Sequence, residues 1–172
     1  MANKFIRLIK SRVSCREYSD KRVPTKKVLA VAEAGKYAPS GRNRQIANIY
    51  VVKSKPNVEK LRNLSFELLD RDCMHGVQAI ILVAGPAEDD FTDKDCSCIL
   101  ENMFLAAHSL GLGSCWINQF DSLLRSKNGL KVKKTLGIPD NFKVVGGCAL
   151  GYVKDNVSLE VKERKADFIK IL

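Results

Sequence analysis

Three residues near the start of the chain alternate in a pattern suited to binding phosphate. Arg12, Ser14 and Arg16 are separated by single residues in the run Arg-Val-Ser-Cys-Arg. If this segment is extended, all three side chains point to the same side of the backbone. Two guanidinium groups around a hydroxyl offer several hydrogen-bond donors in fixed geometry, which suits a phosphate. Three exposed residues of a linker would give the same pattern, so both interpretations stay open.

A second donor-rich segment follows a predicted helix. Residues 40–45 read Ser-Gly-Arg-Asn-Arg-Gln, and Gly41 gives this run a flexible backbone. Loops held by a rigid scaffold often carry binding residues. An ordinary turn explains the composition equally well.

The remaining reactive side chains form no catalytic set. His75 and His108 are the only imidazoles, and the six cysteines include no Cys-x-x-Cys pair, so we expect no metal site. Cys115 and Cys148 lie in apolar runs and are expected to be inert core thiols. His108 lies in an apolar helical stretch, where a packed histidine is expected rather than a base.

Size and composition favour one domain over residues 1–172. The chain is 45% hydrophobic, and no apolar run is long enough to span a membrane. The N-terminus lacks the apolar stretch of a signal peptide, so the cysteines are expected to be reduced. We expect a cytoplasmic protein without membrane association.

Positive charge is concentrated at the N-terminus of a chain whose net charge is +10. Residues 1–27 contain only Glu17 and Asp20 as acids, whereas the basic residues are Lys4, Arg7, Lys10, Arg12, Arg16, Lys21, Arg22, Lys26 and Lys27. This density suggests nucleic acid, a phosphorylated cofactor or a solvated basic face. No RNP-type motif or zinc finger accompanies it, so nucleic acid is the less favoured partner.

The element that the fold is expected to pack around covers residues 95–117. Ile99 and Met103 recur at helical spacing, and Phe104 helps to widen the apolar stripe. A helix this apolar should be buried on most sides. A short buried strand is predicted to follow at residues 114–117.

Helices and strands interleave along the rest of the chain. Helices are predicted at residues 5–12, 25–37, 58–69 and within 122–136, and further strands at residues 46–52, 79–84 and 144–153. Thr25 is expected to cap its helix, and Asn128-Gly129 is expected to break the last helical region. The order predicts a single α+β or α/β domain.

Taken in order, these segments resemble the flavin-dependent nitroreductase family over nearly the whole chain. The matching stretches are residues 12–16, 38–45, 105–117 and 136–139, a strand that leads into Gly151-Tyr152, and the basic C-terminal segment. The resemblance implies an α+β fold with a mixed sheet flanked by helices, a long buried central helix and an intertwined homodimer. It also implies FMN at the dimer interface and NADH or NADPH as a transient donor. Electrons would pass by a two-step exchange to a nitroaromatic, quinone or similar electrophile.

The resemblance assigns cofactor-binding roles and no catalytic side chain, because flavin N5 carries the chemistry. The implied residues are Arg12, Ser14, Arg16, Pro39, Ser40, Asn43, Gln45, Asn118, Gln119, Lys162 and Arg164. Arg12, Ser14, Lys162 and Arg164 would hold the phosphate. Arg16 would lie near the ring and stabilise reduced flavin. Those at 40, 43 and 45 would reach FMN from the partner subunit, and the backbone at 118–119 would approach N5. Trp116 is expected in the core or near the flavin.

Two features depart from larger family members. Only residues 85–94 occupy the place of their lid helices, and Gln119 stands where many have glycine. The same fold could serve dehalogenation, ring oxidation or flavin fragmentation, or could bind FMN without turnover. No Gly-x-Gly-x-x-Gly follows a strand, so the nicotinamide cofactor would be a passing substrate.

Overall fold

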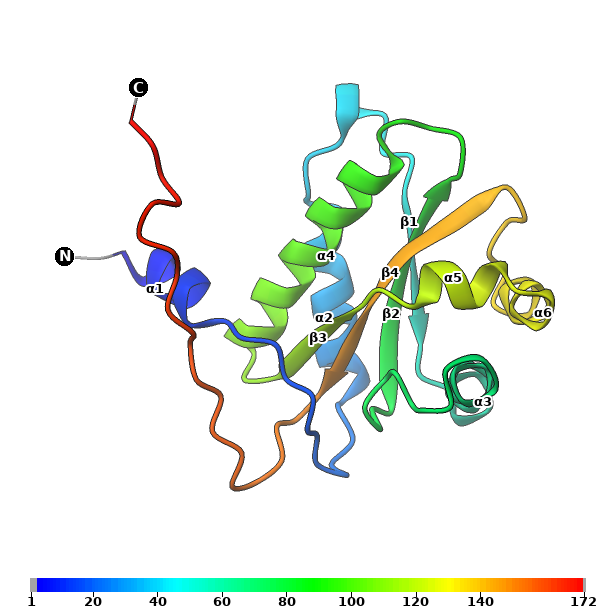
Figure 1. Cartoon of the computed structure of the whole chain (residues 1–172), viewed down its shortest axis with the longest axis horizontal. Coiled ribbons are helices and arrows are strands. Elements are labelled where there is room, and N and C mark those ends of the chain that lie inside the picture. The colour runs from blue at the N-terminus through cyan, green and yellow to red at the C-terminus, as the bar shows by residue number, and fades with distance from the viewer. Residues whose placement is uncertain (1–2, 172) are drawn as a thin grey trace.

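The computed structural model describes residues 3–171 and shows helices on both faces of one four-stranded sheet (Figure 1). The elements are α1 (Lys4–Ser11), α2 (Thr25–Lys36), the 3-10 helix η1 (Gly41–Asn43), β1 (Asn48–Val52), α3 (Lys55–Leu69), β2 (Ala79–Pro86), α4 (Thr92–Ser109), β3 (Gly113–Ile117), α5 (Phe120–Arg125), α6 (Lys127–Thr135) and β4 (Phe142–Gly151). The predicted α+β fold is confirmed. No helix within the described range is long and apolar enough to cross a membrane.

The sheet has the strand order β1-β2-β4-β3, and every pair of neighbouring strands is antiparallel. This corrects the expectation of a mixed sheet for the four strands. β2 and β3 run in the same direction, but β4 lies between them and pairs antiparallel with both. Parallel pairing in the described chain is limited to the bridge between Ser14 and Ser114.

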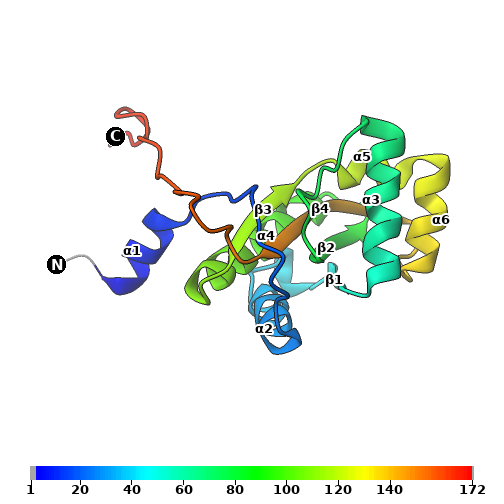
Figure 2. The same cartoon turned by 90° about the horizontal axis from the view of Figure 1, so that it is seen from below.

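β2 is buried on both faces, which explains its continuous apolar sequence. Ile80 and Leu82 belong to the core under α3, α5 and α6, whereas Ile81 and Val83 belong to the core under α2 and α4. Figure 2 shows the two helical layers on either side of the sheet. Two cores that share one strand therefore hold the domain together.

The central helix α4 packs against α2 and the sheet, and its buried side includes Leu100 and Met103. It is less buried than expected, because Lys94, Cys98 and Glu101 form an exposed stripe on this single chain. The helix ends as predicted near Gly111, whose φ is +70°. Apolar periodicity thus predicted the helix correctly but overestimated how much of its surface is buried.

Two local predictions were wrong. Pro24, not Thr25, is the N-cap residue of α2, and it makes no side-chain cap bond. The break in the last helical region falls at Ser126, whose hydroxyl caps α6 by accepting a hydrogen bond from Gly129 N at 3.0 Å. Asn128 and Gly129 therefore lie inside α6.

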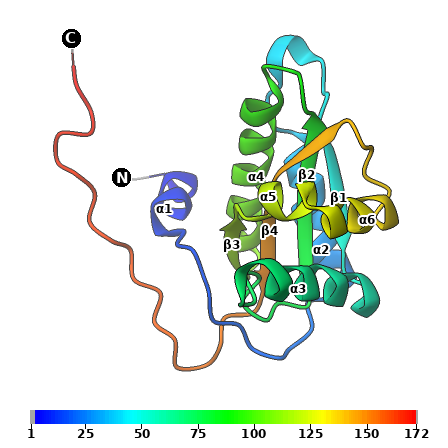
Figure 3. The same ribbon diagram turned by 45° about the vertical axis from the view of Figure 1, so that its right-hand side comes forward.

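α1 and the C-terminal segment project from the same side of the body (Figures 1 and 3). α1 has no buried residue, and Ser11 Oγ lies 2.8 Å from His108 Nε2 on α4. His108 is half-buried, so it is less fully packed than the sequence predicted. The segment after Val153 is extended and has no regular secondary structure up to Ile171, and Leu172 lies outside the described residues.

Candidate functional site

The segment that carries Arg12, Ser14 and Arg16 runs beside β3. Ser14 forms a parallel bridge with Ser114, and Cys15 N donates a hydrogen bond to Ser114 O at 2.8 Å. Cys15 is fully buried, whereas Ser14 and Arg16 are exposed. This alternation is that of an extended chain, so the predicted backbone of the segment is confirmed.

A glycine at the start of β3 allows this close approach. A Cβ at Gly113 would lie 2.8 Å from Cys15 Cβ, nearer than side chains tolerate. The thiol of Cys115, on the same strand, has a pKa raised by burial, and the charges of Arg16 and Arg12 lower it in part. On this segment Arg16 is exposed and Arg12 is half-buried.

Asn118 and Gln119 follow the other end of the same strand, in the turn into α5. Asn118 is exposed and Gln119 is half-buried. Asn118 is four positions after Ser114, which at strand geometry is about 13 Å. Arg12 and Ser14, which are predicted to bind the phosphate, thus lie at the opposite end of β3 from Asn118 and Gln119, which are predicted to approach the flavin ring.

A histidine that no motif marks lies close to Arg16. Burial lowers the pKa of His75, and the positive charges of Arg16 and Arg71 lower it further, against an opposing effect of Asp72. Its backbone φ is +58°, in the left-handed region. Only the fold brings the 71–75 loop beside the basic segment.

The loop with Pro39, Ser40, Asn43 and Gln45 lies elsewhere on this chain, beside the N-terminal end of α4 (Figures 1 and 3). It is well ordered internally, because Gln45 N donates to Ser40 Oγ at 3.2 Å and Gln45 Nε2 donates to Asn43 Oδ1 at 2.9 Å. Asp95 on α4 anchors it by accepting from Gly41 N. One chain therefore does not bring this loop to the Arg12–Arg16 segment.

Lys162 and Arg164 lie in the extended C-terminal segment, and both are exposed. That segment leaves the body where Lys154 N donates to Glu17 O at 3.1 Å, one residue after Arg16. Lys162 and Arg164 therefore belong to a segment that starts beside Arg16, on the same side of the molecule as the Arg12–Arg16 segment.

The cysteines behave as expected for core thiols. Cys115 and Cys148 are buried, and burial raises the pKa of both. Trp116 is half-buried and packs on Phe104, with 6.0 Å between ring centroids. Its buried Nε1 has no hydrogen-bond partner among residues 3–171. Within that range no cluster of potential metal ligands occurs.

The residues along β3 fit flavin mononucleotide. Arg12, Ser14 and Arg16 supply donors at one end of the strand, and the turn with the exposed Asn118 and the half-buried Gln119 lies at the other. A family model described as the nitroreductase family matches residues 9–72 and 65–152 of this sequence. The chain belongs to the nitroreductase family.

Relatives of this nitroreductase-family chain agree in sequence and in structure. A protein of Archaeoglobus fulgidus with the provisional name NADH dehydrogenase/NAD(P)H nitroreductase is 31% identical over 155 residues, covering 87% of this chain and 86% of its own length. A crystal structure of a nitroreductase with bound FMN from Bacteroides fragilis has a TM-score of 0.92 at 33% identity, covering 99% of this chain and 100% of that one. A nitroreductase with bound FMN from Desulfitobacterium hafniense has a TM-score of 0.87 at 25% identity, and the match covers 100% of both chains.

The short connection between β2 and α4 is a tight turn in this nitroreductase-family chain. Asp89 N donates to Pro86 O at 3.3 Å, and Phe91 N donates to Asp89 Oδ1 at 3.0 Å. Arg44 reaches the turn with a bidentate pair to Asp89, which holds the pKa of that carboxyl below its usual range. The connection is therefore a short, internally bonded turn that contains no helix of its own.

Proposed function

We propose that this chain is an FMN-dependent oxidoreductase that takes electrons from NADH or NADPH and passes them to a nitroaromatic, quinone or similar electrophile. The observation that carries the proposal is the alignment of Arg12, Ser14 and Arg16 beside β3, with Asn118 and Gln119 at the other end of that strand. Family membership and two FMN-bound relatives support it.

Each group of residues has one task in this proposal. Arg12 and Ser14 bind the phosphate, and Lys162 and Arg164 complete that site. Arg16 places a cation near the ring, where it favours the negative charge that reduction creates. When bound, FMN supplies the ring that accepts a hydride from the nicotinamide donor and passes the electrons onward.

We also propose that the active form is a homodimer, with Ser40, Asn43 and Gln45 reaching FMN from the partner subunit. The separation of this loop from the basic segment within one chain supports the proposal (Figure 1). Exposed apolar side chains support it as well. Phe5 on α1 is 60% exposed, and Phe168 and Ile169 in the C-terminal segment are each 83% exposed. Sedimentation equilibrium measures the mass directly, and a monomer at micromolar concentration with FMN bound would contradict the dimer.

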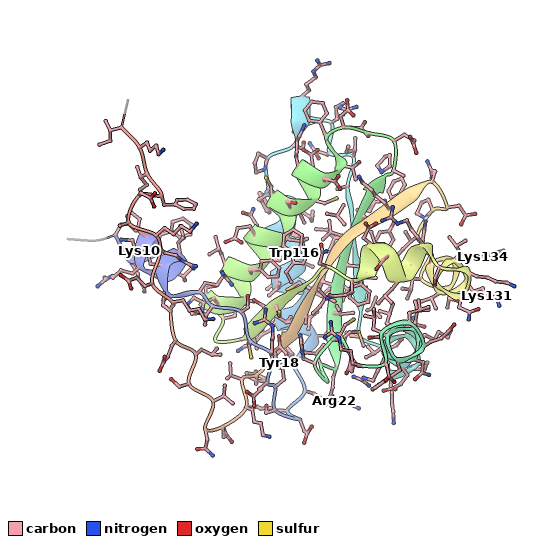
Figure 4. All side chains as sticks on the ribbon, viewed as in Figure 1. Lys10, Tyr18, Arg22, Trp116, Lys131 and Lys134 are labelled. Atoms are coloured by element: carbon pink, nitrogen blue, oxygen red, sulfur yellow. The ribbon has the colours of Figure 1, made fainter. Side chains whose placement is uncertain are left out.

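The flavin site is tested by Arg12→Ala, with Lys134→Ala as a control. Both variants remove one positive charge, but Lys134 is exposed on α6, at the far side of the molecule from the basic segment (Figure 4). We expect Arg12→Ala to bind FMN about tenfold more weakly or worse, since a charged hydrogen bond contributes roughly 1.5–3 kcal/mol. Lys134→Ala should bind FMN like the wild type.

The same samples test the competing nucleic-acid hypothesis. Affinity for a mixed-sequence DNA duplex should be weak and steeply salt-dependent in the wild type and in both variants, because it would come from phosphate contacts alone. Loss of DNA affinity in Arg12→Ala alone, with unchanged FMN affinity, would contradict the flavin site. The cytoplasmic location expected from the sequence stays a prediction.

A further inference from the structure

A cavity of about 500 Å³ lies at the end of the sheet where the inner strand β2 begins and the inner strand β4 ends. Its walls come from the loop after Arg16, from the first turns of α3 and from the strand ends. The lining includes Tyr18, Lys21, Arg22, Lys53, Lys55 and Gln78. Figure 4 shows Tyr18 and Arg22 at this end of the sheet. No residue proposed above to bind FMN lines it.

The rim of the cavity is cationic. Lys21, Arg22, Lys53 and Lys55 are all exposed there. Glu59 is the one carboxylate among the described lining residues, and it forms an ion pair with Arg62, which also lines the cavity and pairs with Asp72 as well. A cavity with this charge balance attracts an anion.

Two of these cations are free to bind a ligand. Lys53 Nζ donates to Thr25 Oγ1, and Lys21 Nζ lies 4.7 Å from the centre of the Tyr152 ring. Arg22 and Lys55 make no side-chain hydrogen bond or ion pair with any residue between 3 and 171. The first turn of α3, which Lys55 begins, also has no acidic residue and no side-chain cap. Both features leave positive charge available at the rim.

The floor of the cavity is apolar. Val58, Val77 and Ala79 line it, and each is at most 5% exposed. The Tyr18 ring forms one wall and is fixed by its hydroxyl, which donates to Cys15 O at 2.7 Å. A free phosphate ion would use only the rim. A ligand with phosphate groups and a flat organic part would use the rim and the floor, and the volume lies within the range of small-molecule sites.

The cavity adjoins the proposed flavin site along the chain. Tyr18 is two residues after Arg16, and the lining residue Gly76 follows His75, whose pKa is lowered by the charge of Arg16. We propose that this cavity binds the phosphate-bearing half of the nicotinamide donor. The inference rests on the proposed function, because it assumes that NADH or NADPH is the electron donor.

Calorimetry on the FMN-loaded protein tests this inference with two probes, ADP-ribose and 2′-phospho-ADP-ribose, which are NADH and NADPH without the nicotinamide. The probe that binds the wild type more tightly is then used for all variants. We expect one site per chain in the wild type. Arg22→Ala and Lys55→Ala should each weaken binding about tenfold, since each removes a charged contact. Lys134→Ala, which removes an equally exposed lysine on α6, should leave the Kd unchanged. All variants should retain FMN.

Three outcomes would overturn the inference. The first is a wild type that binds neither probe, the second is binding by the Arg22 and Lys55 variants that equals that of the wild type, and the third is an equal loss of binding in Lys134→Ala. Reduction of the same samples by reduced nicotinamide mononucleotide, which lacks the adenylate half, separates this failure from that of the proposed function. If reduced nicotinamide mononucleotide reduces the flavin normally, any of these three binding results contradicts only the assignment of the cavity. A holoprotein that no nicotinamide reduces removes the proposed function and the donor assignment together.

Discussion

Asp95 Oδ1 accepts a hydrogen bond from Gly41 N at 2.9 Å and so ties the start of α4 to the loop that carries Ser40. The carboxylate is only 4% exposed, and its second oxygen has no partner within residues 3–171. A Cβ at Gly41 would lie 2.2 Å from the Phe91 ring, so the loop is also packed tightly at this point. Asp95 therefore positions a loop proposed to contact FMN.

Asp95→Ala should lower both stability and FMN affinity. The half-buried Gly41 N–H loses its acceptor, which costs about 1 kcal/mol, and the loop loses its anchor. We expect about tenfold weaker FMN binding, measured by flavin fluorescence, and a lower urea midpoint. Asp95→Asn, which keeps an acceptor oxygen, should recover most of the loss. Glu101→Ala, at an exposed position of the same helix, is the matched control, and equal effects of both alanine variants would contradict the anchoring role.

Arg16→Ala should raise the pKa of His75. The positive charge of Arg16 disfavours the imidazolium form, so its removal favours protonation. Burial would still hold the pKa below its usual range, because desolvation is the largest cause of the shift. NMR titration of the His75 ring checks the direction, with Lys10→Ala as a control at a basic site on α1. An unchanged His75 titration in Arg16→Ala would place Arg16 away from this loop.

Gly129→Ala should destabilise the protein although alanine is the better helix former by about 1 kcal/mol. A Cβ at this position would lie 2.0 Å from the backbone oxygen of Leu123 and 2.7 Å from Leu124 Cα. Backbone atoms cannot move aside as a side-chain end can, so α5 and α6 would have to separate. We expect a loss of roughly 1–3 kcal/mol in urea unfolding. Lys131→Ala, on the exposed side of α6, should be nearly neutral, and a stabilised Gly129→Ala would refute the contact.

The buried thiol of Cys96 should make stability fall at alkaline pH. Burial, reinforced by Asp93 and Asp95, raises its pKa from 9.0 to about 12. Above pH 9 the unfolded chain releases this proton while the folded chain keeps it, so the free energy of unfolding should fall by about 1.4 kcal/mol per pH unit up to pH 12. Urea unfolding at pH 8, 9, 10 and 11 should show this slope as a difference between the wild type and Cys96→Ala. Parallel profiles for the two proteins would contradict the shift.

Apolar patterning predicted the elements of the cores because each pattern is local. The run at residues 79–84 is buried on both faces, and the residues around Met103 form the central helix as expected. The helix break was misplaced because Asn-Gly is also a turn signal, whereas Gly129 serves to bring α6 close to α5. The strand directions also escaped prediction, since the insertion of β4 between β2 and β3 is a long-range choice.

The candidate site also contains some residues that a local sequence pattern reveals and others that only the fold brings together. Arg12, Ser14 and Arg16 lie on one strand-like segment, so their alternation was visible in the sequence. His75 and the cationic cavity around Arg22 and Lys55 combine segments far apart in the chain, and no spacing rule links them. Asp95 escaped notice because its partner is a backbone N–H, which carries no sequence signal.

The most direct test of the proposed chemistry is an anaerobic absorption spectrum of the protein after incubation with FMN and desalting. The account predicts a retained flavin spectrum that bleaches when NADH or NADPH is added and returns when a quinone or nitroaromatic acceptor follows. A protein that retains no flavin would contradict the assignment of Arg12, Ser14 and Arg16. A retained flavin that neither nicotinamide bleaches would make the chain a flavin-binding protein without this oxidoreductase activity.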